Sequence, residues 1–285
     1  MRVSFFLYSL LFFGDINSQE YLPISAGELV KHEFYTLSYN EKHEQANWVH
    51  YKLDDFLISG DIERKDRFKA DPNVSTGSSF PSDYAGSGYD RGHLVPAADM
   101  KLNSISMAET FYMSNISPQL PRFNRGIWKR LETLVRIWAK ESSVYVTTAG
   151  ILNNNISTTI GVNKVSVPKR FFKIIYSPSD QKMIGFLIPN EKSSQDLKSF
   201  VINVDDIEGI TGIDFFSELP DDLENYLERG SSSDRWIFYD NHVKSKKNKI
   251  DSNKDLITRC AALTKSNVQC KRNSTKFSLF CWQHK

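Results

Sequence analysis

The hydrophobic and polar positions of this 285-residue chain repeat with two periods, which predict strands and helices in turn. Residues 21–60 alternate polar and aromatic positions, as in HEFYTLSYNEKHEQANWVHYKL, and predict paired strands with a turn near Asn40-Glu41. Residues 61–88 are rich in Pro, Gly, Ser and Asp and predict a loop. The Val, Tyr and Thr content of SSVYVTTAGIL (142–152) predicts a buried strand, and RFFKIIYS with KMIGFLIP predicts a hairpin around residues 178–180.

A helical period follows a short apolar run at residues 111–116, which predicts a strand that ends near Pro118. We expect the helix to begin at or near Asn124, because asparagine is a good N-cap residue. Its apolar face packs on a core and consists of Ile127, Leu131, Leu134, Val135 and Trp138. Asn124 and Glu132 are eight residues apart, about 80° around a helix, and can point to one side. Farther on, VDDIEGITGIDFFSELPDDLENYLE predicts short helices.

The N-terminus carries a hydrophobic run from Val3 to Phe13, broken by Ser4 and Ser9 and preceded by Arg2. The run is too short to span a bilayer and is typical of a secretory signal peptide, residues 1–18. A buried N-terminal strand is the alternative. We therefore expect a secreted or periplasmic protein that has no contact with a membrane once the signal is removed.

Composition adds a division of charge to this pattern. The chain is 40% hydrophobic and 13% aromatic, enough for a sizeable core, and its net charge of +2 names no partner. Residues 241–285 contain eleven Lys and Arg against two Asp and Glu, so this segment carries +9 and the rest carries −7. Residues 19–240 then form the main domain, and the polar, Lys-rich residues 241–258 form a linker.

The last segment, residues 259–285, contains all three cysteines of the chain. Cys260, Cys270, Cys281 and His284 have the spacing C-x9-C-x10-C-x2-H, and three thiolates with one imidazole make a closed zinc site. The segment resembles small Cys3His modules appended to other domains. It is therefore interpreted as a module stabilised by Zn²⁺, with an unstructured basic tail as the alternative. Its lysines would add a sequence-independent grip on nucleic acid.

The stretch GYDRGHLVPAADM (88–100) carries the densest candidate chemistry. On a strand, Arg91 and His93 would share one face, so one can grip phosphate while the other activates water. Gly92 is expected to let the backbone pass close to the site. A lone histidine is more often a packed residue than a base. The case for His93 as a catalytic base therefore depends on the other motifs in the sequence.

Three motifs accompany it in order: DRGH, then SNISPQ, then FNRGIWKRLE. Together they resemble the DNA/RNA non-specific endonuclease family, and the likeness extends over about residues 30 to 220 through DRFKADPNV, VPKRFFKIIYSPSDQKMIGFLIPN and ITGIDFFSELP. The resemblance implies the ββα-metal nuclease fold. That fold is an α+β domain with a central antiparallel sheet flanked by helices, to which the small C-terminal zinc module would be added.

The resemblance also implies roles for individual residues. His93 would be the general base that takes a proton from water. Asn124 would supply an oxygen to Mg²⁺ or Mn²⁺, and Glu132 would hold the metal through water.

Three further residues match positions of the family. Asn115 would help to shape the site, while Arg91 and Arg67 would pair with the phosphate, because the guanidinium fork fits phosphate oxygens. Asp90 is expected to brace the loop.

The function expected from these residues is metal-dependent hydrolysis of phosphodiester bonds in DNA, RNA or both, with little sequence preference. Two alternatives stay open. The protein could be a catalytically silent nucleic-acid-binding protein that keeps the fold and the basic tail, or an organellar or intracellular nuclease.

Overall fold

The computed structural model describes residues 20–153, 156–230, 233–239 and 270. The chain divides into two units, residues 1–238 and 239–285, and most of the second lies outside the described residues. The predicted signal peptide, the linker and three of the predicted zinc ligands, Cys260, Cys281 and His284, also lie outside them. Cys270 is described and is buried. Within the described ranges, no helix combines the length and the apolar character needed to cross a bilayer.

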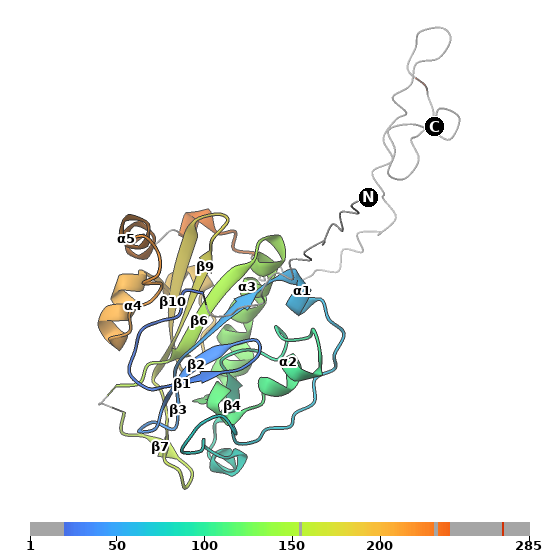
Figure 1. The fold of residues 1–285 in the computed structure, drawn as a ribbon, viewed down its shortest axis with the longest axis vertical. Coiled ribbons are helices and arrows are strands. Elements are labelled where there is room, and N and C mark those ends of the chain that lie inside the picture. The colour runs from blue at the N-terminus through green and yellow to red at the C-terminus, as the bar shows by residue number, and fades with distance from the viewer. Residues whose placement is uncertain (1–19, 154–155, 231–232, 240–269, 271–285) are drawn as a thin grey trace, which may run out of the picture. The chain divides into compact units, whose positions relative to one another are not determined.

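A seven-stranded antiparallel sheet forms the centre of the first unit (Figure 1). The strands lie in the order β1-β2-β3-β6-β9-β10-β11. Their bounds are β1 Glu28–Lys31, β2 Thr36–Asn40, β3 Gln45–Leu53, β6 Val144–Gly150, β9 Arg170–Ser177, β10 Lys182–Pro189 and β11 Val201–Ile202. The central strands β6 and β9 are almost fully buried, since both sheet faces are covered.

Helices cover the two faces of the sheet and divide the core into two clusters. The described α-helices are α1 Asp55–Ile58, α2 Ser104–Glu109, α3 Lys129–Glu141, α4 Val204–Thr211 and α5 Asp221–Arg229. Strand β9 shows the division: Phe171 packs in the cluster beneath α3, whereas Phe172 packs in the cluster with α4 and α5. Successive strand residues point to opposite faces, so α3 and the α4–α5 pair lie on opposite sides of the sheet.

Two small hairpins are separate from this sheet. Strand β4 (Asp90–His93) pairs with β5 (Ile116–Gln119), with Asp90 opposite Gln119 and His93 opposite Ile116. Strand β7 (Thr159–Ile160) pairs with β8 (Val165–Ser166). The β4–β5 hairpin and α3 form the two sides of the candidate site described below.

Most of the predicted elements are confirmed. Strands β2 and β3 meet across the expected turn, β6 covers the predicted buried strand, and β9 pairs with β10 around residues 178–181. The predicted short helices are α4 and α5, and Gly212 ends α4 in the left-handed conformation. The α+β class with a central antiparallel sheet is thus confirmed.

Two boundaries were predicted wrongly. The expected strand at residues 111–116 is a 3-10 turn, Met113–Asn115, followed by β5, which extends through Pro118 to Gln119. Since the β4–β5 hairpin stands apart from the main sheet, its strand can carry a proline that a central strand would not tolerate. The helix does not begin at Asn124 either, because a wide π-helical turn, Phe123–Trp128, precedes α3. Gly126 leaves helical geometry inside that turn, with φ −106° and ψ −111°.

A buried histidine predicts that the folded domain loses stability in acid. His50 on β3 accepts from the Thr147 hydroxyl at Nδ1 (2.8 Å) and donates from Nε2 to the Glu20 carbonyl oxygen (3.0 Å). Both contacts suit the neutral ring, and burial lowers its pKa to about 4. Below pH 6.5, the ordinary pKa of histidine, His50 binds a proton in the unfolded chain but not in the folded protein. The free energy of unfolding therefore falls as the pH drops to about 4.

We expect His50→Gln to remove about 3 kcal/mol of this pH dependence between pH 6.5 and 4. Urea unfolding of wild type and variant at pH 7.5, 5.5 and 4.5 measures it. Equal slopes of unfolding free energy against pH in the two proteins would show that His50 does not cause the loss.

Candidate active site

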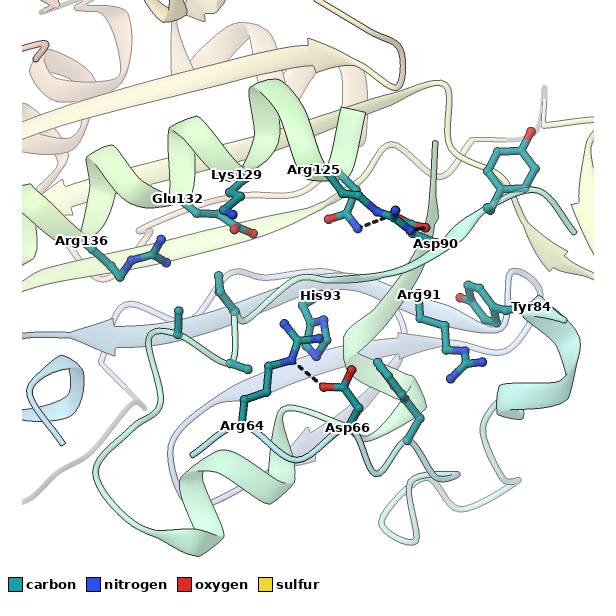
Figure 2. Close-up of a pocket in the computed structure, with 16 residues that line it drawn as sticks. Arg64, Asp66, Tyr84, Asp90, Arg91, His93, Arg125, Lys129, Glu132 and Arg136 are labelled. Carbon is teal, nitrogen blue, oxygen red and sulfur yellow. Dashed lines mark hydrogen bonds and ion pairs between the residues drawn. The ribbon is translucent and has the colours of Figure 1, made fainter. Parts of the chain in front are cut away.

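A cavity of about 600 Å³ lies between the β4 strand, the extended segment 64–68 and the first turns of α3. In Figure 2, Lys129 and Glu132 project from α3 on one side, while His93 and Arg91 stand on the other. Of the six predicted active-site residues, four line this cavity: Arg91, His93, Asn124 and Glu132. The two others, Asn115 and Arg67, are not among its lining residues.

His93 lies at the inner end of β4, between two aromatic rings. Its ring centroid is 5.4 Å from that of Phe68 and 5.1 Å from that of Phe111. The side chain is buried, and its Nε2 atom has no hydrogen-bond partner among the residues described. Burial, followed by the positive charge of Arg64, lowers the pKa of His93 to about 3. The ring is therefore neutral at ordinary pH and can accept a proton.

Arg91 lies two residues before His93 on β4, and both side chains reach the same cavity, as the strand alternation requires. The Arg91 guanidinium carbon stands 4.9 Å from the centroid of the Phe68 ring, which leaves its fork free to turn toward a phosphate. Gly92 lies against the buried side chain of Gln119 on β5. A Cβ at this position would lie 2.2 Å from that side chain, so a larger residue would require Gln119 to move.

Asn124 is held by Asp90 of the facing strand. Its Nδ2 donates to Asp90 Oδ2 (2.9 Å), and Arg125 donates to both oxygens of the same carboxylate (2.8 and 2.6 Å). A carboxylate only accepts hydrogen bonds, so the contact fixes which end of the amide is nitrogen. The Oδ1 atom of Asn124 is thereby left as an acceptor beside the cavity. Asp90 thus braces the site, as expected, and does so through Asn124.

This contact predicts a specific effect of Asp90→Ala. Without the carboxylate the Asn124 amide can turn, and we expect the Mg²⁺ concentration for half-maximal cleavage to rise about 10-fold or more. Arg125→Ala is the matched control, because it removes the ion pair and keeps the Asp90–Asn124 bond. Equal Mg²⁺ requirements in the two variants would show that the ion pair, and not the amide orientation, matters.

Behind Glu132 lies a group of buried charges that the sequence reasoning missed. Lys173 on β9 is 1% exposed, and Asp99 is also 1% exposed. Asp99 accepts from the Tyr51 hydroxyl (2.9 Å) and from Arg136 (2.7 Å). Burial raises the pKa of Glu132, and the positive charge of Lys173 lowers it again. Burial lowers the pKa of Lys173, and the negative charge of Glu132 raises it again in part.

The two predicted residues outside the cavity have other positions. Asn115 is fully buried: its Oδ1 accepts from the Val95 backbone N–H (2.8 Å), and its Nδ2 donates to the carbonyls of Val95 and Thr110 (3.1 and 2.9 Å). It fixes the chain that follows His93, so it shapes the site from behind. Arg67 is exposed, because in the extended segment every second residue, Arg64, Asp66 and Phe68, faces the cavity.

Basic side chains surround the mouth of the cavity. Arg64, Arg91, Arg125 and Lys129 are among the residues that line it. Arg64 donates to Asp66 (2.5 Å), and both side chains are more than half exposed. These cations can draw a phosphate chain toward His93, although the body of the protein is acidic overall.

Comparison with known proteins identifies the family. The profile of the DNA/RNA non-specific endonuclease family matches residues 14–222. The chain belongs to the DNA/RNA non-specific endonuclease family. The resemblance inferred from the DRGH motif and its neighbours is therefore confirmed.

Individual relatives agree with this assignment. The endonuclease is 36% identical over 230 residues to nuclease C1 of Cunninghamella echinulata, covering 74% of this chain and 88% of that protein. It is 34% identical over 214 residues to a nuclease of Nostoc, covering 70% of this chain and 77% of that protein. A chain in the crystal structure of the EndoG/EndoGI complex has a TM-score of 0.63 and 29% identity, covering 69% and 88% of the two chains.

This endonuclease is a phosphodiesterase that acts on DNA or RNA without sequence specificity. The family typically uses Mg²⁺, and its substrates are nucleic acids. The three residues on which the expected turnover depends, His93, Asn124 and Glu132, line one cavity, as an active nuclease requires.

Proposed function

We propose that this endonuclease hydrolyses phosphodiester bonds with His93 as general base, Mg²⁺ or Mn²⁺ at Asn124, and Arg91 on the phosphate. The observation that carries the proposal is that a neutral buried imidazole, an amide oxygen of fixed orientation and a guanidinium line one cavity. Each is the group that one part of the reaction requires.

The donors around Asn124 fit a hard cation. The Oδ1 atom of Asn124 is neutral and left as an acceptor, and Glu132 lines the same cavity. Hard cations such as Mg²⁺ prefer oxygen ligands and keep several waters, so Asn124 would bind directly and Glu132 would act through water. When bound, the cation would stabilise the charge that develops on the phosphate and on the leaving oxygen.

His93 would take the proton from the attacking water. The water oxygen then forms a bond to phosphorus, the bond from phosphorus to the leaving ribose or deoxyribose oxygen breaks, and that oxygen takes a proton from solvent, to which the imidazolium later returns its own. The burial that lowers the pKa of the free imidazole keeps the ring neutral at ordinary pH, and the negative charge of a phosphate that enters the cavity would raise this pKa and make the ring a stronger base.

Arg91 would hold the phosphate in line with that attack. Its position two residues from His93 on β4 sets the guanidinium and the imidazole on one face of the strand. A planar fork can bind two phosphate oxygens at once, which restricts the orientation of the scissile bond.

The test is cleavage of plasmid DNA and of RNA with and without EDTA, followed by readdition of Mg²⁺ or Mn²⁺. We expect EDTA to stop cleavage and either ion to restore it. Asn124→Ala should require far more Mg²⁺ than wild type, while Asn73→Ala, an exposed asparagine outside the cavity, should not. Cleavage that persists in EDTA would refute the metal requirement.

We also propose that residues 259–285 bind Zn²⁺ through Cys260, Cys270, Cys281 and His284. The ligand set and its spacing support this. Metal analysis of the purified protein should find about one zinc per chain, and Cys281→Ser should lose it while cleavage at low salt remains. Full zinc content in Cys281→Ser would refute the ligand set.

Export is proposed from the hydrophobic segment at residues 3–13. Sequencing the N-terminus of the mature protein should find a start near Gln19. A mature protein that starts at Met1 would refute export and favour the organellar or intracellular alternative.

A further inference from the structure

Three carboxylates meet on the sheet face opposite the active site. Asp205 and Glu208 lie one turn apart on α4, and Glu228 lies in the last turn of α5. Figure 1 shows these two helices next to each other at one side of the sheet. One carboxylate oxygen from each residue lies within 4.8 Å of the corresponding oxygens of the other two. Such proximity of three acids costs free energy unless something compensates their charge.

Glu228 is the residue that requires an explanation. It is 5% exposed, and its Oε1 atom is buried without a hydrogen-bond partner among the residues described. Burial, followed by the negative charges of Glu208 and Glu224, raises its pKa to about 9. Glu228 is thus buried, lacks a partner at one oxygen and is directed at two further acids. Such a carboxylate stabilises a fold poorly, but it is a good ligand for a cation.

Among the described residues, the ion pair that compensates these charges lies at the edge of the group. Arg229 Nε stands 3.6 Å from Asp205 Oδ2, but the Arg229 side chain is 72% exposed and this pair faces solvent. Glu208 uses its Oε1 atom to accept from the Phe215 backbone N–H (2.8 Å), which holds the carboxylate in place. Asp205 is open to solvent, Glu208 is fixed, and Glu228 is buried. A cation could therefore reach the group from the Asp205 side and contact Glu228 at its buried end.

We propose that Asp205, Glu208 and Glu228 bind a hard divalent cation, and that Ca²⁺ fits best. Calcium ligands lie 2.3–2.6 Å from the ion, so oxygens on opposite sides of it are about 4.6–5.2 Å apart. The three oxygens lie within 4.8 Å of one another, close enough to bind one such ion, and Ca²⁺ accepts irregular sets of carboxylates with water in the remaining positions. Mg²⁺ demands a tighter octahedron and is less suited. The ion would connect α4 to α5 and hold both helices on the sheet.

Thermal unfolding in Ca²⁺ tests the proposal separately from the catalytic metal. The starting protein is full-length Asn124→Ala, since it lacks the proposed active-site ligand. With Ca²⁺ at about 100 times its Kd, we expect Tm to rise by roughly 5 °C or more. Isothermal titration calorimetry with CaCl₂ should show one site. No rise in Tm and no heat of binding would overturn the proposal.

Matched variants then locate the ion. Adding Glu228→Gln, which keeps the shape and removes the charge, should abolish the Ca²⁺-dependent rise, whereas Asp222→Asn in the exposed first turn of α5 should keep it. If Glu228→Gln fails to fold, Asp205→Asn at the solvent edge should lose the rise in the same way. A Ca²⁺-dependent rise that survives these substitutions would place the ion elsewhere and refute the site.

Discussion

His93→Ala is expected to lower kcat for plasmid cleavage by about 10²–10⁴-fold with little change in the amount of folded protein. The histidine is the proton acceptor proposed for the attacking water, and among the residues that the structure describes no second imidazole lines the cavity. A positioned general base contributes a factor of this size, whereas the arginines and the metal site that remain continue to bind substrate. Steady-state cleavage in saturating Mg²⁺ measures the change.

His43→Ala is the matched control for this experiment. His43 is also buried, with Nδ1 2.8 Å from the Ser166 hydroxyl, but it does not line the cavity. Both variants remove a buried imidazole, so a loss of packing alone would affect both. Our assignment predicts that only His93→Ala loses kcat. Normal cleavage by His93→Ala would leave the family assignment intact and remove His93 from the mechanism.

Lys173→Met is expected to lower the free energy of unfolding by about 3 kcal/mol or more. Lys173 is buried beneath Glu132, with its Nζ 4.9 Å from the centroid of the Trp128 ring and without a hydrogen-bond partner among the described residues. Its removal leaves the Glu132 and Asp99 carboxylates with Arg136 as the remaining neighbouring buried cation. A buried charge that loses its partner is costly, and methionine fills a similar volume without charge.

The same substitution should impair catalysis through Glu132. Lys173 lowers the pKa of Glu132, so its loss moves that pKa upward and the side chain takes up a proton at higher pH. We therefore expect the acid side of the pH–activity profile to shift to higher pH. Lys169→Met, an exposed lysine just before β9, is the control and should change neither property.

A double variant separates charge from packing. Glu132→Gln combined with Lys173→Met removes both charges, so most of the lost stability should return while activity stays low. Urea unfolding of the wild type, the two single variants and the double variant gives the coupling free energy. Additive losses in this cycle would show that the two residues do not interact and would refute the pairing.

Local periodicity was sufficient for much of the fold. The alternation in residues 36–53 and the two apolar runs in residues 170–189 predict the hairpins that are observed, because a polar turn separates the strands of each pair. The motif block also placed Arg91, His93, Asn124 and Glu132 in one site, and the strand alternation expected for Arg91 and His93 is observed.

What failed depended on contacts between distant segments. Asn124 is a good capping residue, yet its side chain bonds to Asp90, 34 residues earlier, and the helix begins farther on. Arg64 and Arg67 lie on different sides of one extended segment. Contacts with distant residues set these sides, because Arg64 lies over the Phe111 ring and Phe68 lies against His93. Lys173 did leave a signal: it is the one charged residue in FFKIIY (171–176), and a buried lysine there requires a carboxylate nearby.

The wide turn before α3 sets the rotational phase of that helix. The backbone leaves helical geometry at Gly126, between Asn124 and Glu132, so the two residues need not obey the regular spacing of a single helix. Removing one residue from residues 123–128 would rotate everything after it by about 100° and move it by about 1.5 Å. Glu132 would then point away from His93, and the apolar face of α3 would leave the core. The number of residues in this turn is therefore as constrained as the identity of the reactive side chains.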